Sequence, residues 1–132
     1  MQLKVKRVYE QPSSGDGQRV LVDRLWPRGL KKESAQLDAW LKDLAPSDAL
    51  RKWFGHEAAK WTEFRRRYFE ELEDQGEALD ELRGLAAKGT VTLLYAAHDT
   101  EHNNAVALKD YLEKHRAKAQ RAAHEDKARA RR

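Results

Sequence analysis

Residues 91–97 read VTLLYAA, an apolar run followed by the polar stretch HDTEHNN at residues 98–104. A short run of this kind, rich in β-branched and aromatic residues, predicts a strand that is buried on both faces. Apolar residues then recur at helical spacing, at Leu108, Tyr111 and Leu112. The stretch therefore predicts a strand, a turn and a helix in series.

Two earlier segments predict further strands. Residues 3–9 begin by alternating apolar and basic side chains, which is typical of a strand at the margin of a sheet. Residues 20–22 read VLV, a second run that suits a buried strand. Strands early and late in the chain, with helices between them, imply crossover connections and parallel pairing. The expected fold is α/β, with a small, mainly parallel sheet flanked by helices in a single domain.

The segment between the strands carries helical patterns of unequal strength. Residues 34–44 are ambiguous, because their apolar spacing suits a helix while their start has no strong cap. Ser47 is a good N-cap for a short helix that should end near Gly55. Residues 61–72 and 79–85 repeat apolar side chains at helical spacing, and each predicts a further helix.

The composition excludes several classes of protein. The 132 residues include no cysteine, which rules out disulfides, thiolate metal sites and a cysteine nucleophile. No apolar run approaches the roughly 20 residues needed to cross a bilayer, and the N-terminus does not resemble a signal peptide. We therefore expect a cytoplasmic protein that has no membrane partner.

The net charge of +4 is unevenly distributed along the chain. Residues 114–132 hold eight Lys or Arg against two acidic residues, a net charge of +6, so the rest of the chain carries about −2. We expect an α/β domain over residues 1–116 and a basic helical tail that frays over residues 117–132. Nucleic acid is a candidate partner for this tail. The sequence does not indicate an oligomeric state.

The first candidate site follows the VLV run, where Asp23 is succeeded by Arg24, Trp26, Arg28 and Gly29. Guanidinium groups bind phosphate or carboxylate bidentately, an indole can stack on a planar ligand, and Pro and Gly fix a bend. The alternative is structural, with Arg24 paired to Asp23 or a glutamate and Trp26 filling the core.

The second candidate site is the polar stretch 98–104, between the last expected strand and the last helix. Ligands of parallel sheets bind outside the C-terminal strand ends, so we expect both sites at this edge. His98 and His102 are candidate general acids or bases, and Asn103 and Asn104 are candidate ligand-binding residues. The alternative is that Thr100 or Asn103 merely caps the helix.

A metal site is weakly indicated, because His98 and His102 have the i, i+4 spacing that binds zinc only on a helix, and this stretch reads as a turn. The chain lacks a glycine-rich phosphate loop, a dinucleotide fingerprint, a nucleophile elbow and an HExxH pair. We therefore predict no metal and no cofactor, and we disfavour the corresponding enzyme classes.

Five stretches carry a resemblance to a known family: Arg19–Gly29, Leu44–Ser47, Leu50–Phe54, Trp61–Leu72 and Leu93–Leu108. Over residues 3–113 the chain resembles the YeaO-like branch of domain-of-unknown-function family 488. The resemblance implies an α/β fold and a prokaryotic cytoplasmic setting, but no agreed activity. A sister branch carries Cys-His-Arg at the turn that corresponds to residues 102–104, which implies a shared pocket. This chain has no cysteine, so thiol chemistry does not carry over.

The leading hypothesis is a pocket for a small phosphorylated or nucleotide-like anion. If the protein is an enzyme, it is expected to be a hydrolase or group transferase. His98 or His102 would then be the acid or base, Arg24 and Arg28 would stabilise negative charge, and Asp23 would orient a histidine or an arginine. One alternative is a non-catalytic interaction or nucleic-acid-associated protein that uses its basic C-terminal tail. Another makes both polar segments a buried structural network.

Overall fold

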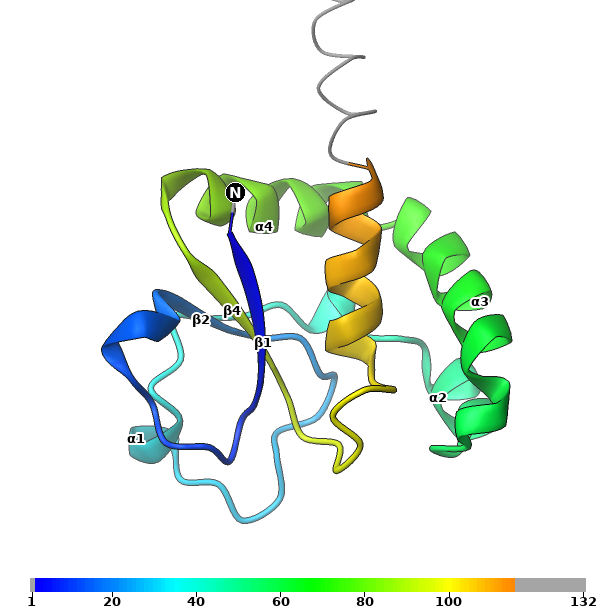
Figure 1. Cartoon of the computed structure of the whole chain (residues 1–132), viewed down its shortest axis with the longest axis horizontal. Coiled ribbons are helices and arrows are strands. Elements are labelled where there is room, and N and C mark those ends of the chain that lie inside the picture. Colours follow the sequence, from blue (N-terminus) through cyan, green and yellow to red (C-terminus); the bar gives the residue numbers. More distant parts are fainter. Residues whose placement is uncertain (1, 116–132) are drawn as a thin grey trace, which may run out of the picture.

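The computed structural model describes residues 2–115, which form a four-stranded sheet with helices packed against it (Figure 1). The strands are β1 (Leu3–Arg7), β2 (Gln18–Leu21), β3 (Ala39–Trp40) and β4 (Val91–Tyr95). Their order is β1-β4-β2-β3, and every neighbouring pair is parallel. The prediction of an α/β fold with a small parallel sheet is confirmed.

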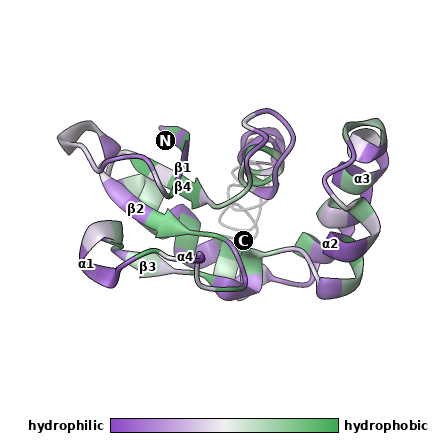
Figure 2. Cartoon of the chain, turned by 90° about the horizontal axis from the view of Figure 1, so that it is seen from below, coloured by the Kyte–Doolittle hydropathy of each residue, from purple (hydrophilic) through white to green (hydrophobic). Residues whose placement is uncertain are grey.

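The helices are α1 (Lys32–Ala35), α2 (Asp48–Phe54), α3 (Trp61–Glu73), α4 (Gly76–Lys88) and a last described helix over residues 104–115. Short 3-10 turns occupy Ser14–Asp16, Lys42–Leu44 and Ala58–Lys60. Figure 2 looks at the edge of the sheet at which the strands end, and there α2 and α3 lie to one side of the strands.

Helix α2 has the ends that the sequence predicts. The Ser47 hydroxyl accepts the N–H of Leu50 at 3.1 Å, and Gly55 closes the helix with a left-handed φ of 53°. The ambiguous stretch 34–44 is not one helix, because Gln36 takes a φ of 47° and ends α1 after one turn. The carboxylate of Asp38 then accepts the N–H of Arg19 at 2.7 Å, which brings β3 alongside β2.

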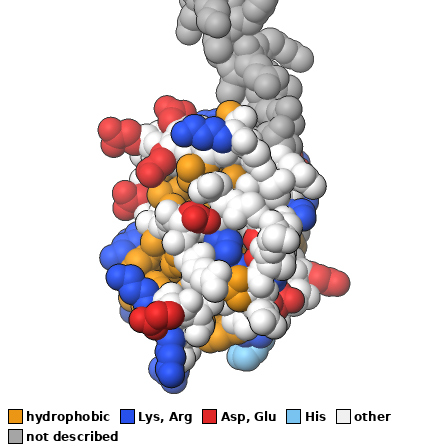
Figure 3. Space-filling model, turned by 90° about the vertical axis from the view of Figure 1, so that its left-hand side faces the viewer, with side chains coloured by type: hydrophobic (Ala, Val, Ile, Leu, Met, Phe, Trp, Pro, Cys, Tyr) orange, Lys and Arg blue, Asp and Glu red, His pale blue; other side chains and the backbone are white. Residues whose placement is uncertain are grey.

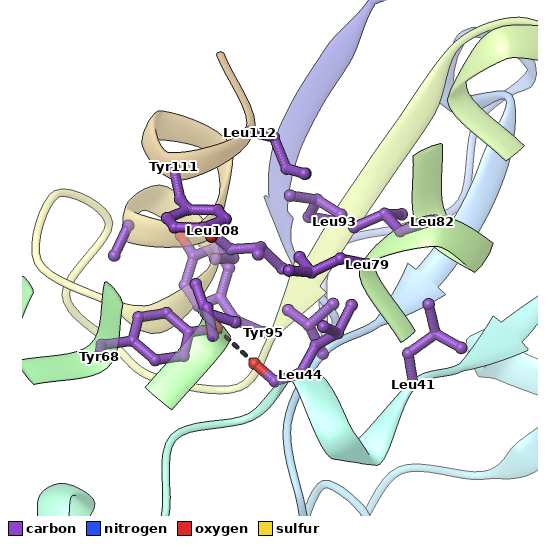
Figure 4. Close-up of a cluster of buried hydrophobic side chains, with 14 of the residues drawn as sticks. Leu41, Leu44, Tyr68, Leu79, Leu82, Leu93, Tyr95, Leu108, Tyr111 and Leu112 are labelled. Atoms are coloured by element: carbon purple, nitrogen blue, oxygen red, sulfur yellow. Dashed lines mark hydrogen bonds between the residues drawn. The ribbon is translucent and has the colours of Figure 1, made fainter. Parts of the chain in front are cut away.

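Strand β4 is buried along its whole length, and its alternate side chains enter two different cores. Leu93 lies in the larger core with Leu79, Leu82, Leu108 and other apolar side chains of the helices (Figure 4). Leu94 points to the other face, where Trp26 and Trp40 cover it together with Val8 and Leu21. This burial on both faces is what the apolar run predicts.

A buried ion pair fixes the loop between β1 and β2. Asp16 and Arg19 are only 5% and 4% exposed, and an Arg19 Nη1 donates to the Asp16 carboxylate at 2.6 Å. The rest of the guanidinium donates twice to the carbonyl of Ala35, at 3.0 and 2.8 Å. Lys6 and Ser13 also donate to Asp16. Each of these charged groups therefore has partners on all sides, as burial requires.

The Asp16 carboxylate is expected to make stability depend on pH. Burial raises its pKa, but the bonds from Ser13, Lys6 and Arg19 outweigh burial and hold the pKa well below the ordinary value of 3.8. The stabilisation is therefore present above pH 3.8 and is lost as the pH falls below it toward the folded-state pKa. Asp16→Asn should cost at least about 1.5 kcal/mol at neutral pH, and the difference from wild type should shrink in acid.

Urea unfolding of both proteins across the acid range checks this expectation. Asp43→Asn is the control, because Asp43 is exposed and its side chain makes no hydrogen bond or ion pair with residues 2–115. It should follow the wild type at every pH. A difference between wild type and Asp16→Asn that stays constant below pH 3.8 would contradict the assignment.

The predicted basic tail at residues 117–132 lies outside the described residues, and so does the boundary at residue 116. On the face shown in Figure 3, Lys and Arg side chains are interspersed with acidic and hydrophobic ones. On this face, the mixture of signs offers no continuous cationic path for a nucleic-acid backbone. The nucleic-acid prediction rests on the tail and stays a prediction.

Candidate functional site

The loop after β2 is held in place by side chains that leave its arginines at the surface. The Trp26 indole N–H donates to the carbonyl of Leu30 at 2.8 Å, and its ring meets Trp40 edge-on at 5.5 Å. The Tyr9 hydroxyl donates to the carbonyl of Arg28 at 2.8 Å. Trp26 therefore packs as the structural alternative predicts, while Arg24 and Arg28 remain exposed.

The loop after β4 turns into the last described helix through two capping side chains. Asn103 is buried, its Oδ1 accepts the N–H of Val106 at 3.0 Å, and its Nδ2 donates to the carbonyl of Asp99 at 2.9 Å. Asp99 Oδ1 accepts the N–H groups of Glu101 and His102 at 2.9 and 3.0 Å. Asn103 thus caps the helix, and its polar atoms are engaged within the protein.

The two loops meet at the C-terminal edge of the sheet. Asp23 Oδ2 accepts the N–H of Ala96 at 2.9 Å, and Asp23 Oδ1 accepts an Nδ2 hydrogen of Asn104 at 3.0 Å. The same Asn104 amide donates to the carbonyl of Val22 at 3.0 Å. These bonds join the end of β2, the end of β4 and the start of the last described helix.

Asp23 therefore has a different role from the one predicted. Its hydrogen bonds go to Ala96 and Asn104, and none within residues 2–115 goes to a histidine or an arginine. Burial raises the pKa of Asp23, against the hydrogen bonds from Asn104 and Ala96, which lower it. The carboxylate therefore fastens the loop after β2 to the loop after β4.

A cavity of about 610 Å³ opens between these loops and α2. In Figure 1 the 96–103 loop (yellow) lies between the segment after β2 (light blue) and α2. Among the predicted site residues, Asp23, Arg24, Trp26, Arg28, His98, His102, Asn103 and Asn104 all line the cavity. Gly29 does not line it, although its φ of 74° supports the bend that presents Arg28. The two polar segments thus share one concave surface of the size that small-molecule sites have.

The two arginines that the sequence predicts for the cavity have no partner for their side-chain charge among the described residues. Within residues 2–115, the guanidinium groups of Arg24 and Arg28 make no hydrogen bond and no ion pair, so the predicted alternative of an Arg24–Asp23 pair is not formed. Both carboxylates that line the cavity, Asp23 and Asp99, are already satisfied by N–H donors. Positive charge is therefore left available to a ligand.

The two candidate histidines differ in their surroundings. His102 Nδ1 lies 2.9 Å from Asp99 Oδ2, and its ring meets Trp61 edge-on at 5.3 Å. The backbone bonds from Glu101 and His102, followed by the His102 side chain, lower the pKa of Asp99. His98 is exposed, and its ring makes no hydrogen bond with the described residues. His102 is thus the oriented histidine, with Nε2 left for a ligand or proton.

Helix α2 and its C-terminal turn supply cavity residues that lie outside the predicted pocket. Arg51, Phe54 and His56 line the cavity, together with Phe64 of α3. His56 has a φ of 59°, an uncommon conformation for a residue with a side chain. Gly55 marks the turn in the sequence, but nothing local indicates that this turn reaches the strand ends.

Within residues 2–115, no group of three or more His, Cys, Asp or Glu side chains has a metal-binding arrangement. Within the same residues, no helix has the length and apolar character needed to span a bilayer.

The sequence was compared with known proteins. The family described as "Inactive DUF488-N3 subclade" matches residues 2–130. The uncharacterized protein YeaO of Escherichia coli (strain K12) is 44% identical over 112 residues, which cover 85% of this chain and 97% of YeaO. The uncharacterized protein Rv3073c of Mycobacterium tuberculosis (strain ATCC 25618 / H37Rv) is 44% identical over 110 residues, 83% of this chain and 92% of that protein. No solved structure was found to match the chain.

Proposed function

Because this chain belongs to the DUF488 family, within the subclade described as inactive, we propose that it binds a small anionic metabolite in the cavity without converting it. The observation that carries the proposal is the pair Arg24 and Arg28, which line the cavity and whose guanidinium groups have no partner within residues 2–115. As part of the same proposal, the protein is cytoplasmic and meets a metabolite there.

The cavity also favours a ligand with a flat apolar part. Trp26, Phe54 and Phe64 contribute to its lining beside the arginines. Phosphate alone would leave most of about 610 Å³ unfilled, whereas a nucleotide-like or aryl phosphate would occupy both the charged and the apolar surface. We therefore propose a phosphorylated, ring-containing metabolite.

A second candidate function is hydrolysis or group transfer, which the His102–Asp99 pair favours. A histidine whose Nδ1 is held by a carboxylate at 2.9 Å can accept a proton from water or a hydroxyl at Nε2. In this role Asp99 positions the ring, and Arg24 and Arg28 stabilise the developing charge. Release of product from a bound phosphate ester, abolished by His102→Gln with binding retained, would support this candidate over binding alone.

The test of the binding proposal is a thermal-shift screen of nucleoside monophosphates and sugar phosphates. A ligand at about 100 times its dissociation constant adds roughly 2.7 kcal/mol to the stability of the folded state, so the melting temperature should rise by several degrees. In Arg24→Gln/Arg28→Gln the affinity should fall at least about tenfold, because each charge-assisted hydrogen bond contributes about 1.5–3 kcal/mol.

The matched control is Lys31→Gln/Lys32→Gln, which removes the same charge from exposed residues nearby that do not line the cavity. With this control variant, the ligand should raise the melting temperature as much as it does with the wild type. The proposal fails if no phosphate ester raises the melting temperature of the wild type. It also fails if a ligand raises the melting temperature of the arginine variant as much as that of the control.

A further inference from the structure

We infer that the cavity recognises a ligand with two separated anionic groups, and that Arg51 of α2 binds the second of them. The inference rests on the proposed function, in which Arg24 and Arg28 bind the first group. It adds Arg51 as a specificity-determining residue, which lies on α2 and not on the loop after β2.

Arg51 lies on α2, whereas Arg24 and Arg28 lie on the loop after β2, and all three line the cavity. Figure 1 shows the 96–103 loop between these two segments. The three arginines therefore come from two separate segments of the chain, so a ligand with two anionic groups could find a separate partner for each.

Arg51 is held only weakly by its own helix. Its Nη2 is 3.4 Å from the Asp48 carboxylate, and the two side chains are 51% and 61% exposed. Exposed pairs of this kind contribute little to stability, because water already solvates both charges. Arg51 can therefore turn to a ligand at small cost.

The carboxylates of the cavity make no hydrogen bond with Arg51 among residues 2–115, although the charge of Arg51 acts to lower the pKa of Asp23. Asp23 accepts bonds from Ala96 and Asn104, and Asp99 accepts bonds from Glu101 and His102. These two carboxylates face three arginines with weak or no partners in the described part of the chain. An incoming ligand with a single anionic group would leave part of this positive charge unmatched.

Apolar surface lies between the charged walls. Pro46, Phe54 and Phe64 line the cavity on the side of α2, and Trp26 and Pro27 line it on the other side. A ligand that reaches both walls would therefore place an apolar body against these rings and an anionic group at each end. The chemical class is a ring-containing phosphate that carries a second acid, such as a carboxylate or another phosphate.

The experiment compares three probes by isothermal titration calorimetry on the full chain: phenyl phosphate, 3-carboxyphenyl phosphate and 4-carboxyphenyl phosphate. The two isomers place the carboxylate at different distances from the phosphate. At least one isomer should bind wild type about tenfold more tightly than phenyl phosphate does, which is the effect of one additional charge-assisted hydrogen bond.

In Arg51→Gln this gain should disappear, so that phenyl phosphate and both carboxyphenyl phosphates bind the variant with similar affinity. Arg51→Lys keeps the positive charge but loses the paired N–H donors of the guanidinium group, so it should retain part of the gain in affinity. Lys52→Gln removes a charge from the neighbouring exposed residue, which does not line the cavity, and should keep the whole gain. The melting temperature of each variant confirms that it is folded.

The outcomes separate the inference from the function on which it rests. If phenyl phosphate binds through Arg24 and Arg28 but neither isomer binds more tightly, the inference is overturned and the proposed function stands. The same holds if Arg51→Gln keeps the gain. If no probe binds at millimolar concentration, the proposed function is overturned as well.

Discussion

Replacing Arg19 with methionine is expected to lower the free energy of unfolding by about 3–5 kcal/mol, a large part of the stability of a domain of this size. Methionine fills much of the same volume, but it removes the 2.6 Å bond to Asp16 and both donors to the Ala35 carbonyl. Asp16 then stays buried with one fewer cation beside it. Urea denaturation followed by tryptophan fluorescence measures the loss.

Arg66→Met is the matched control. Arg66 also bonds to carboxylates, Glu63 and Glu70, but on the exposed surface of α3, where water screens the pairs. Arg66→Met should therefore change the free energy of unfolding little. The double variant Asp16→Asn/Arg19→Met should lose less than the sum of its single changes, because both act on one pair. An Arg19→Met loss no larger than that of Arg66→Met would show that the buried pair does not hold the loop.

Replacing Gly17 with alanine is expected to cost about 4 kcal/mol. Gly17 has φ 62° and ψ −134°, a conformation close to the region that glycine alone adopts readily. A Cβ there would stand 2.2 Å from the carbonyl oxygen of Thr90, the same oxygen that accepts the Gln18 N–H at 2.9 Å. Backbone strain and overpacking each contribute about 1–3 kcal/mol, and β2 would separate from the start of β4.

Gly29→Ala isolates the contribution of the close contact. Gly29 has a φ of 74°, but no atom lies within 4 Å of the position that its Cβ would take. This variant should lose only about 1–2 kcal/mol, from the left-handed conformation alone. Melting temperatures by circular dichroism compare the two. Equal losses at the two glycines would mean that the contact with Thr90 relaxes freely.

Much of the fold was predictable because its signals are local. The β4 run is apolar at every position, and each of its faces has a core. Helix α2 is capped by Ser47 at its start and by Gly55 at its end, and both signals act within one turn of the chain. The 34–44 stretch was not predictable in this way. Its course depends on bonds to Arg19 and Asp23, which lie far away in the sequence.

The candidate site, like the fold, could be predicted from the sequence only in part. Parallel strands bring the segments after β2 and β4 to one edge, so their meeting followed from topology. The partners of Asp23 and Asn104 could not be foreseen, because each side chain has several possible acceptors and donors nearby. Arg51 and His56 were not predicted to belong to the pocket, because only tertiary packing carries the end of α2 to the cavity.

The strand order leaves β1 and β3 at the two edges of the sheet, and this bears on how the protein behaves when it is concentrated. β3 is only two residues long, so it offers a second chain almost no ladder to extend. β1 carries Lys4 and Lys6, whose ammonium groups bond to the loop carbonyls of Gly15 and Gln11. Short edges and edge lysines oppose the strand-to-strand association that begins aggregation.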